Sequence, residues 1–331
     1  MTLRLVLLPG DGIGPEVTGA AEQVLRAVCE MADVSLVTES HALGGVAIDE
    51  YGDPLPPDTL AACKAANGIL LGAVGGPKWD GQKLRPEQGL LRLRGELGLY
   101  ANLRPVKVFE GLEHLSPVRN VAGMDIVIVR ELTGGIYFGE RQEGEEIASD
   151  LCTYSAEEAR RLLEVGYRTA AIREGRLTSV DKANVLATSR LWRREAEKLK
   201  TDHPDVSLDH ELVDAMAMHL VTRPGEFDVV VTENLFGDIL SDEAAAISGS
   251  IGLAASASLG APDAPGLYEP IHGSAPDIAG QGVANPCGAI LSGAMFLRFS
   301  AGREDLATQI EHAVEAALKD NVRTRMIPTI A

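Results

Sequence analysis

Short apolar runs alternate with longer amphipathic stretches along most of the chain. Runs with the length of strands occupy residues 3–8, 34–38, 68–72, 125–130, 176–180, 206–211 and 229–231. Stretches with the period of a helix occupy residues 15–31, 58–66, 87–97, 157–165, 185–199 and 215–221. Strands that alternate with helices in this way predict an α/β fold with a largely parallel sheet.

The stretch 228–243, DVVVTENLFGDILSDE, shows this alternation clearly. Its apolar run 229–231 is suited to a strand buried on both faces, and Asn234 and Gly237 interrupt it. From Asp238 onward, a helix would place a core-facing stripe at Ile239, Leu240, Ala244 and Ile247. The same helix would bring Asp238 and Asp242, four residues apart, together on another face.

These two carboxylates would lie beside the carboxyl end of a strand, where open α/β sheets usually bind ligands. Paired carboxylates are suitable oxygen ligands for Mg2+ or Mn2+. Acidic residues in a first helical turn can instead simply complement the helix dipole. Several predicted strands also end at a charged residue, and together these residues predict a site: Arg104, Arg130, Lys182, Asp214 and Asp238.

A glycine-rich turn follows the first predicted strand. Gly10, Gly12 and Gly14 form G-x-G-x-G, and Pro15 suits the first position of a helix. The dinucleotide fingerprint G-x-G-x-x-G is not matched, so the turn alone fits either phosphate binding or a plain tight turn.

Charge and cysteine content exclude several classes of protein. The chain has 331 residues, of which 30 are basic and 48 acidic, and its formal charge of −18 opposes binding to nucleic acid or to anionic membranes. Its four cysteines are far apart, which disfavours a zinc site and a disulfide framework. The N-terminal apolar run is too short for a signal peptide, and the uncharged stretch 244–262 favours an interior helix and loop over a membrane span. We therefore expect a cytoplasmic protein.

Seven motifs along the chain resemble those of one enzyme family. They are PGDGIGPEV (9–17), GGPKWD (75–80), VRELTGGIYFGE (129–140), SVDKANVL (179–186), VDAMAMHLV (213–221), FGDILSDE (236–243) and EPIHGSAPDIAGQGVANP (269–286). In this order they resemble the isocitrate/isopropylmalate β-decarboxylating dehydrogenases. The resemblance implies a two-domain α/β fold with a large, mostly parallel mixed sheet, which is not a Rossmann domain.

The resemblance also implies how the domains are divided. The first domain would combine residues 1–98 with 250–331 and carry the adenosine-binding loop. The second, 99–249, would carry the dimer interface and an exposed arm from the acidic stretch 139–150. The active-site cleft would lie between them, and in a homodimer Lys182 and Asp214 would reach in from the partner subunit.

Within this family the substrate is read from the helix that contains GLLRLR, residues 89–94. This motif is similar to the isopropylmalate branch, so Glu87, Leu90, Leu91 and Val185 are expected to face the substrate side chain. Each methyl group buried there would contribute about 1 kcal/mol. The same fold acting on D-malate, tartrate, isocitrate or homoisocitrate is the alternative.

The resemblance assigns the polar residues as well. Arg94, Arg104 and Arg130 would bind the substrate carboxylates, because a guanidinium pairs bidentately with a carboxylate. Asp214, Asp238 and Asp242 would hold Mg2+ or Mn2+, with Asp214 also contacting the substrate. Lys182 would accept the hydroxyl proton during hydride transfer, and Tyr137 would protonate the enolate left after loss of CO2.

The cofactor implied by the resemblance is NAD. Asp277 would accept hydrogen bonds from the adenosine ribose and repel the 2′-phosphate of NADP, although it can also be a simple helix cap. The expected cofactor contacts are Ile13, Asn184, His272, Gly273, Ala275, Asp277 and Asn285. The implied reaction converts 3-isopropylmalate into 2-oxoisocaproate (4-methyl-2-oxopentanoate) and CO2 in leucine biosynthesis.

Two positions depart from the family pattern. Glu233 stands where many isopropylmalate enzymes have glycine, and the chain reads RTRMIPTIA at 323–331 where relatives continue with a closing helix. From the C-terminal difference we expect lower stability than in those relatives, but no loss of the site. The alternative from another functional class is a catalytically inactive binding subunit of the same fold. Against it, the chain keeps all eight polar residues that the resemblance assigns to substrate, metal and proton transfer, namely Arg94, Arg104, Arg130, Tyr137, Lys182, Asp214, Asp238 and Asp242.

Overall fold

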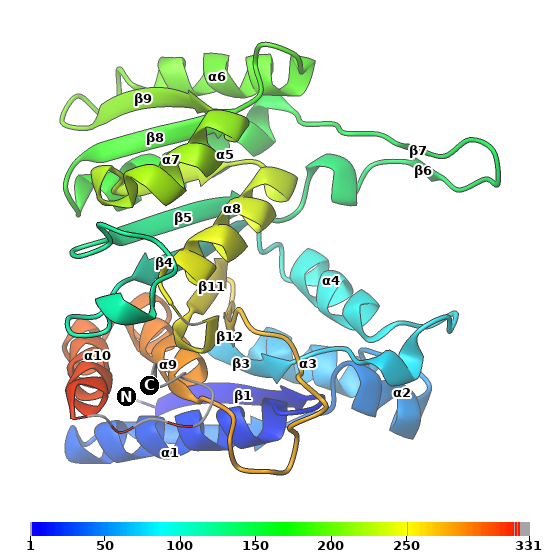
Figure 1. The fold of residues 1–331 in the computed structure, drawn as a ribbon. Helices are drawn as coiled ribbons and strands as arrows, with labels where there is room; N and C mark the ends of the chain where they lie inside the picture. The colour runs from blue at the N-terminus through cyan, green and yellow to red at the C-terminus, as the bar shows by residue number, and fades with distance from the viewer. Residues whose placement is uncertain (1, 250, 321, 323, 325–331) are drawn as a thin grey trace. The chain divides into compact units, whose positions relative to one another are not determined.

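The two ends of the chain form one unit and its middle forms another (Figure 1). Unit 1 consists of Met1–Leu99 and Ser250–Ala331, and unit 2 of Tyr100–Gly249. The computed structural model describes residues 2–249, 251–320, 322 and 324. The expectation for residues 323–331 therefore lies outside the described residues, apart from Thr324. Each unit is described by itself below.

Unit 1 is built on five strands in the order β2-β1-β3-β12-β11. Pairing is parallel from β2 to β12 and antiparallel between β12 and β11. The strands are β1 (Thr2–Gly10), β2 (Ser35–Ser40), β3 (Gly68–Ala73), β11 (Ala255–Leu259) and β12 (Gly266–Pro270). The helices are α1 (Gly14–Met31), α2 (Gly45–Tyr51), α3 (Pro57–Ala65), α4 (Pro86–Glu96), α9 (Cys287–Phe299) and α10 (Glu304–Lys319), with short 3-10 helices at Pro77–Trp79 and Ile251–Leu253.

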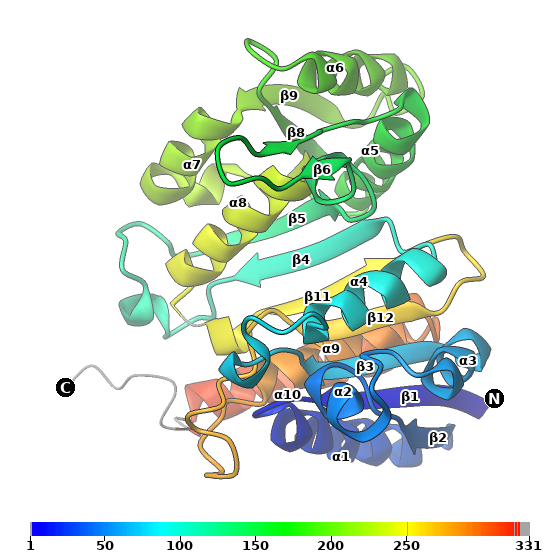
Figure 2. The same ribbon diagram turned by 90° about the vertical axis from the view of Figure 1, so that its right-hand side faces the viewer.

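Successive side chains of β1 point to opposite faces of this part of the sheet. Val6 and Leu8 are fully buried in a cluster with Cys63 of α3 and Leu93 of α4. On the other side, α1, α9 and α10 pack against one another, and α1 and α9 also contact the strands. Figure 2 shows α2, α3 and α4 toward the viewer, with α9 and α10 behind them. Because both faces are covered there, the central strand β3 is apolar and buried along its whole length.

Gly12, in the turn between β1 and α1, has a φ of +59°, and a Cβ there would lie 1.9 Å from the Ser274 carbonyl oxygen. We expect Gly12→Ala to lower the free energy of unfolding by roughly 2–4 kcal/mol, from backbone strain and the clash together. Urea unfolding measures this effect. The control is Gly19→Ala inside α1, where a Cβ meets nothing within 4 Å, and where alanine should raise stability by about 0.5–1 kcal/mol. Equal effects at the two positions would contradict this account of the turn.

In unit 2, five strands lie side by side in the order β4-β5-β10-β8-β9. β4 and β5 are antiparallel, and the other neighbouring pairs are parallel. The strands are β4 (Ala101–Lys107), β5 (Asp125–Glu131), β8 (Arg176–Asp181), β9 (Ser207–Leu212) and β10 (Val229–Thr232). The helices are α5 (Ala156–Ala171), α6 (Ala187–Leu199), α7 (Val213–Thr222) and α8 (Asn234–Ile247), with 3-10 helices at Glu113–Leu115, Gly135–Tyr137 and Pro224–Glu226.

The core of unit 2 lies between these strands and the helices α7 and α8. Ile126 and Ile128 of β5 and Val230 of β10 are fully buried there against Met216 of α7 and Leu240 of α8. Helices α5 and α6 pack against each other, and α5 contacts β5, β8 and β10. A Ser155 side chain caps α5 by accepting from Glu158 N, at 3.1 Å. The predicted α/β fold with a large, mostly parallel mixed sheet is confirmed.

Some predicted elements are wrong in detail. α8 begins at Asn234, so Asp238 lies in its second turn, where we expected a helix start at Asp238 itself. Ile239 is 56% exposed and does not belong to the buried stripe. The stretch predicted as an interior helix and loop contains β11, because its small alternating residues Ala255, Ser256 and Ala257 pair antiparallel with β12. Val229–Val231 is fully buried, as predicted.

The acidic stretch after Gly139 forms a ribbon at the right of Figure 1, where β6 (Arg141–Gln142) pairs with β7 (Ser149–Asp150). Residues 141–150 are all exposed, as expected from their composition. All four cysteines are free thiols. In the described part of the chain, no helix combines the length and the apolar character that crossing a membrane requires.

Candidate active site

Parallel strands in unit 2 bring several predicted site residues to one edge. β5, β10, β8 and β9 run parallel, so their carboxyl ends, followed by Asn234, Lys182 and Asp214, share that edge. Arg104 was expected at the end of a strand, but it lies in the middle of antiparallel β4, opposite Ile128. It still comes close to the carboxylates of α8, because β4 contacts that helix.

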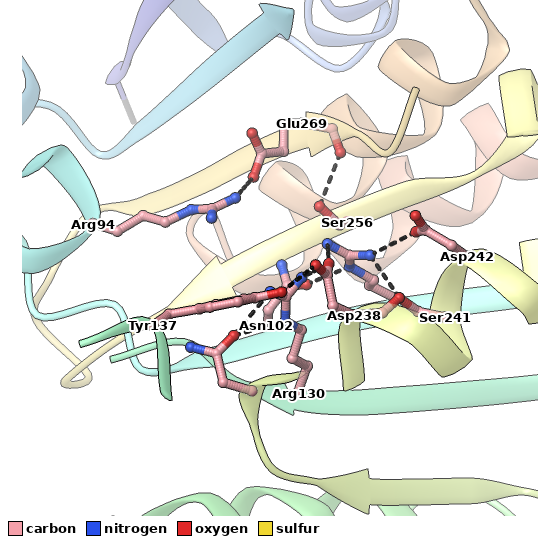
Figure 3. A network of polar contacts seen from close by, with 11 residues as sticks. Arg94, Asn102, Arg130, Tyr137, Asp238, Ser241, Asp242, Ser256 and Glu269 are labelled. Carbon is pink, nitrogen blue, oxygen red and sulfur yellow. Dashed lines mark hydrogen bonds and ion pairs between the residues drawn. The ribbon is translucent and has the colours of Figure 1, made fainter. Parts of the chain in front are cut away.

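Asp238 lies between Arg130 and Tyr137 (Figure 3). Its Oδ1 pairs with Arg130 Nη1, and its Oδ2 accepts a hydrogen bond of 3.0 Å from the Tyr137 hydroxyl. Arg130 also donates to Asn234 Oδ1 at 3.1 and 2.8 Å. Gly237 makes room for this arginine, since a Cβ there would lie 2.6 Å from Arg130 Cγ. The pKa of Tyr137 is raised by burial and by the negative charge of Asp238, so this phenol stays protonated and able to donate.

Arg104 connects to the same helix one turn further along. It donates to Ser241 Oγ at 2.6 Å and to Asp242 Oδ1 at 3.2 Å, while Asn102 Oδ1 accepts from its Nε at 2.7 Å. Its Nη2 lies 3.7 Å from Asp238 Oδ1. Burial raises the pKa of Asp242, and the Arg104 charge opposes this shift. The two carboxylates and two guanidiniums therefore form a charge-balanced network on one side of unit 2.

This network suits a divalent cation. Asp238 and Asp242 lie one helical turn apart and offer carboxylate oxygens, which Mg2+ and Mn2+ prefer. No group of three or more His, Cys, Asp or Glu side chains able to hold a metal is found among the described residues. The third predicted ligand, Asp214, instead pairs with Lys182. The chain thus supplies two candidate ligands on one face of α8, and arginines compensate their charge.

Lys182 lies in a turn after β8 that is fixed by hydrogen bonds to side chains of α6. Its ammonium group pairs with Asp214, and this hydrogen bond lowers the pKa of the Asp214 carboxyl. The Lys182 backbone N–H donates to Ser189 Oγ at 3.0 Å. The preceding residue, Asp181, is 1% exposed and accepts two hydrogen bonds from Arg193, at 2.8 and 2.9 Å. The backbone of Lys182 is therefore fixed, while Asn184 and Val185 on the same turn are exposed.

Glu233 is a buried acid next to this site, at the N-terminus of α8. It is 8% exposed, and its Oε2 lies 3.8 Å from Cys152 Sγ. Burial raises its pKa to about 7, and the nearby Glu131 carboxylate adds to the shift. The neutral form of Glu233 is therefore favoured up to that pH.

A carboxyl with a raised pKa in the native state binds protons that the unfolded chain releases, so stability falls as pH rises from about 4.5 to about 7. We expect Glu233→Gln, which is neutral at every pH, to exceed the wild type in free energy of unfolding by roughly 3 kcal/mol at about pH 8 and to come close to it near pH 4.5. Urea unfolding at both pH values measures the difference. A gain that does not change with pH would contradict the raised pKa.

In unit 1, helix α4 carries four predicted substrate residues on one face. Glu87, Leu90, Leu91 and Arg94 are spaced i, i+3, i+4 and i+7, whereas Leu93 of the same helix faces the core. Leu91 is 40% exposed, so this face presents apolar surface between the Glu87 carboxylate and the Arg94 guanidinium.

Arg94 extends from α4 to pair with Glu269 of β12 (Figure 3). Its Nε is buried and makes no hydrogen bond to any described residue. Arg94 therefore keeps one unused donor next to its ion pair.

The predicted cofactor residues of unit 1 lie in the segment 271–286, between β12 and α9. Ile13 N donates to Ser274 O at 2.8 Å, which joins this segment to the glycine-rich turn. Burial lowers the pKa of His272, so its imidazole is neutral. Within the described structure, His272 Nε2 and Asn285 Nδ2 are buried without a hydrogen-bond partner. Two buried nitrogen atoms without a hydrogen-bond partner are compatible with the binding of a polar ligand, such as the adenosine of NAD.

Several residues of these networks were not predicted. They are Asn102, Asn234, Ser241 and Glu269. The i, i+4 spacing of Asn234 and Asp238 was a signal in the sequence that could have revealed one member of this group. Asn102 is also close in sequence to Arg104, and Ser241 is close to Asp238 on α8. Only the contact of Glu269 with Arg94, 175 positions away, depends entirely on the tertiary fold.

The matching family model is that of the isocitrate/isopropylmalate dehydrogenases, and it covers residues 4–331. The chain is similar to the 3-isopropylmalate dehydrogenase of Lactococcus lactis, with 54% identity over 326 residues, 98% of this chain and 94% of the relative. It is also similar to the 3-isopropylmalate dehydrogenase of Bacillus subtilis, with 54% identity over 335 residues, 98% of this chain and 92% of the relative.

Solved structures agree with this assignment. An isocitrate dehydrogenase from Methylococcus capsulatus has a TM-score of 0.89 and 35% identity, over 99% of this chain and 95% of that one. A β-decarboxylating dehydrogenase from Thermococcus kodakarensis has a TM-score of 0.83 and 37% identity, over 99% of this chain and 92% of that one. The motifs, the fold and the relatives thus point to one assignment, and the chain belongs to the isocitrate/isopropylmalate dehydrogenase family.

Proposed function

We propose that the protein catalyses the NAD-dependent oxidative decarboxylation of 3-isopropylmalate to 2-oxoisocaproate and CO2, a step of leucine biosynthesis. The observation that carries this proposal is the network of Arg104, Arg130, Tyr137, Asp238 and Asp242, which combines carboxylate-binding cations, metal-binding carboxylates and a protonated phenol. The names of relatives that are identical to this chain at more than half of the aligned positions support the choice of substrate.

Substrate binding would use charge and shape together. Arg94, Arg104 and Arg130 would bind the two carboxylates of the malate moiety, and the apolar Leu90 and Leu91 would contact the isopropyl group. Exposed Leu91 supports this role, because covering its surface removes apolar area from water. In isocitrate a third carboxylate would face these leucines without a partner, which is unfavourable. Glu87 and Val185 would complete the surroundings of the side chain.

The chain supplies two groups for proton transfer. Lys182 would accept the proton of the C2 hydroxyl in its neutral amine form, after the ammonium group that pairs with Asp214 has released its own proton to water. Tyr137, kept protonated by its raised pKa, would protonate the enolate carbon left after CO2 departs. NAD would supply the hydride acceptor, and the divalent cation would supply the Lewis acid that polarises the substrate oxygen.

The expected cofactor residues fit this scheme. Asp238, Asp242 and Asp214 would hold Mg2+ or Mn2+. The segment 271–286 would bind adenosine through His272, Gly273, Ala275, Asp277 and Asn285, with Ile13 beside it and Asn184 contributing from its turn. Asp277 is exposed on this segment, and its charge would disfavour a 2′-phosphate, so NAD is proposed over NADP.

We also propose a cytoplasmic homodimer in which Lys182 and Asp214 serve the partner subunit's site. Exposed apolar side chains on α7 and α8, namely Met218, Val221 and Ile239, support an interface on unit 2. The ribbon 139–150 is proposed as the arm of this dimer.

The test is NADH production with Mg2+ present and 3-isopropylmalate, isocitrate, D-malate and tartrate compared at equal concentration, then repeated with NADP and with a chelator. Strong preference for 3-isopropylmalate with NAD, abolished by chelator, is expected. Preference for another acid would refute the assignment of Leu90 and Leu91. Activity with none would favour an inactive binding subunit of the same fold.

A further inference from the structure

The segment 271–286 is a long connection without a helix or strand of its own. Connections of this length are uncommon unless they bind something, and their order depends on contacts from elsewhere. At its base, Ile13 N donates to Ser274 O, and Ala275 is held at a φ of +36°. Further along, the backbone hydrogen bonds within the segment are short-range turn contacts, such as that from Ile278 N to Ala275 O at 3.2 Å.

A second anchor holds the tip of the segment. The Glu16 carboxylate, from the first turn of α1, accepts from Gly280 N through Oε1 and from Gly282 N through Oε2, the latter at 3.1 Å. Both glycines have a positive φ, +75° and +65°, which turns their two N–H groups toward the same carboxylate. Glu16 therefore joins residues that lie more than 260 positions away in the chain, and both bonds are charge-assisted.

We propose that Glu16 is a positioning residue of the cofactor site, whose carboxylate holds the segment 271–286 in its binding conformation. The inference rests on the proposed function, since that segment is taken to bind the adenosine of NAD. A segment ordered before binding does not lose further conformational entropy when the ligand arrives, so the affinity is higher. Loss of the anchor should therefore weaken NAD binding and leave the chemical step unchanged.

A simpler role for Glu16 is complementing the dipole of α1. Two variants separate the roles. Glu16→Asp keeps the negative charge in the first turn but is one methylene too short to reach both glycine amides. Glu16→Gln keeps the length but loses the charge and one acceptor oxygen. Glu22→Gln is the control, because Glu22 is also on α1 and its carboxylate binds Arg26 and Thr38 instead.

The experiment combines hydrogen exchange and ligand titration on the full-length protein. Without nucleotide, amides of residues 278–284 should exchange about tenfold faster in both Glu16 variants and at the wild-type rate in Glu22→Gln. The Kd for NAD, measured by calorimetry without substrate, should rise about tenfold in the Glu16 variants. Their kcat at saturating NAD should stay within about twofold of the wild type.

The outcomes separate this inference from the proposed function. Wild-type exchange in Glu16→Asp would leave only the dipole role and overturn the inference. Faster exchange with an unchanged Kd for NAD would also overturn it, because the held segment would then not serve the cofactor. If the wild type itself binds no NAD, the proposed function fails, and the exchange rates still decide whether Glu16 holds the segment.

Discussion

Replacing Lys182 with methionine is expected to lower kcat by about 10³-fold, because the substrate hydroxyl would lose its proton acceptor. The fold should persist, since the Lys182 side chain pairs only with the exposed Asp214 carboxylate among the described residues and its backbone is held independently by Ser189. Steady-state kinetics with 3-isopropylmalate and NAD measures the loss, and circular dichroism checks the fold.

The control for this variant is Lys64→Met. Lys64 is an exposed lysine that also pairs with a carboxylate, Glu96, at 2.7 Å, and lies outside the proposed site. It should keep full activity. If Lys182→Met retains wild-type turnover, another group accepts the proton and the proposed mechanism is wrong.

Replacing Asp238 with asparagine is the second change with a large expected effect. Asp238 contacts both Arg130 and Tyr137, and as a proposed metal ligand it cannot be replaced by a neutral amide without loss of affinity. We expect kcat/KM to fall by about 10²–10³-fold, equivalent to several kcal/mol of transition-state stabilisation. Calorimetric titration with Mn2+ should show weaker binding.

Asp263→Asn, at an exposed loop position of unit 1, removes the same charge and should bind Mn2+ like the wild type. Unchanged Mn2+ affinity in Asp238→Asn would remove Asp238 from the metal site. Full activity together with unchanged affinity would show that the network of Asp238 with Arg130 is structural.

The two inactive variants also test the proposed dimer when they are mixed. If Lys182 serves the partner subunit's site, a heterodimer of Lys182→Met and Asp238→Asn contains one site with both groups intact. Random reassortment should then restore about a quarter of the wild-type activity. No recovery after subunit exchange, verified by mass spectrometry, would place Lys182 and Asp238 in the same subunit's site.

Local patterns were sufficient to predict many elements. The continuous apolar run Val229–Val231 predicted a doubly buried strand, and the glycine-rich turn followed by Pro15 predicted the start of α1. The start of α8 was misplaced because Asn234 and Gly237 resemble breakers. In the structure, Asn234 instead begins the helix and accepts from Arg130, and Gly237 leaves space for that arginine. A tertiary contact thus determined what the local signal meant.

The candidate site shows the same division. The ordered motifs identified the family and the residues to inspect, because these side chains occur together in one order along the chain. They did not show that Arg104 comes from the middle of an antiparallel strand, since the direction of β4 depends on pairing with β5. The anchoring of Gly280 by Glu16 was also hidden, because no local pattern links residues so far apart.

The sequence by itself determined the α/β class through its local periodicity, and its ordered motifs, by their resemblance to known enzymes, indicated the family and the side chains available for catalysis. Only the tertiary structure decided which carboxylate meets which arginine, why Tyr137 stays protonated and how Glu16 reaches the segment 271–286. The reason is physical: pKa shifts and ion pairs depend on distances and burial, which folding sets between residues remote in sequence.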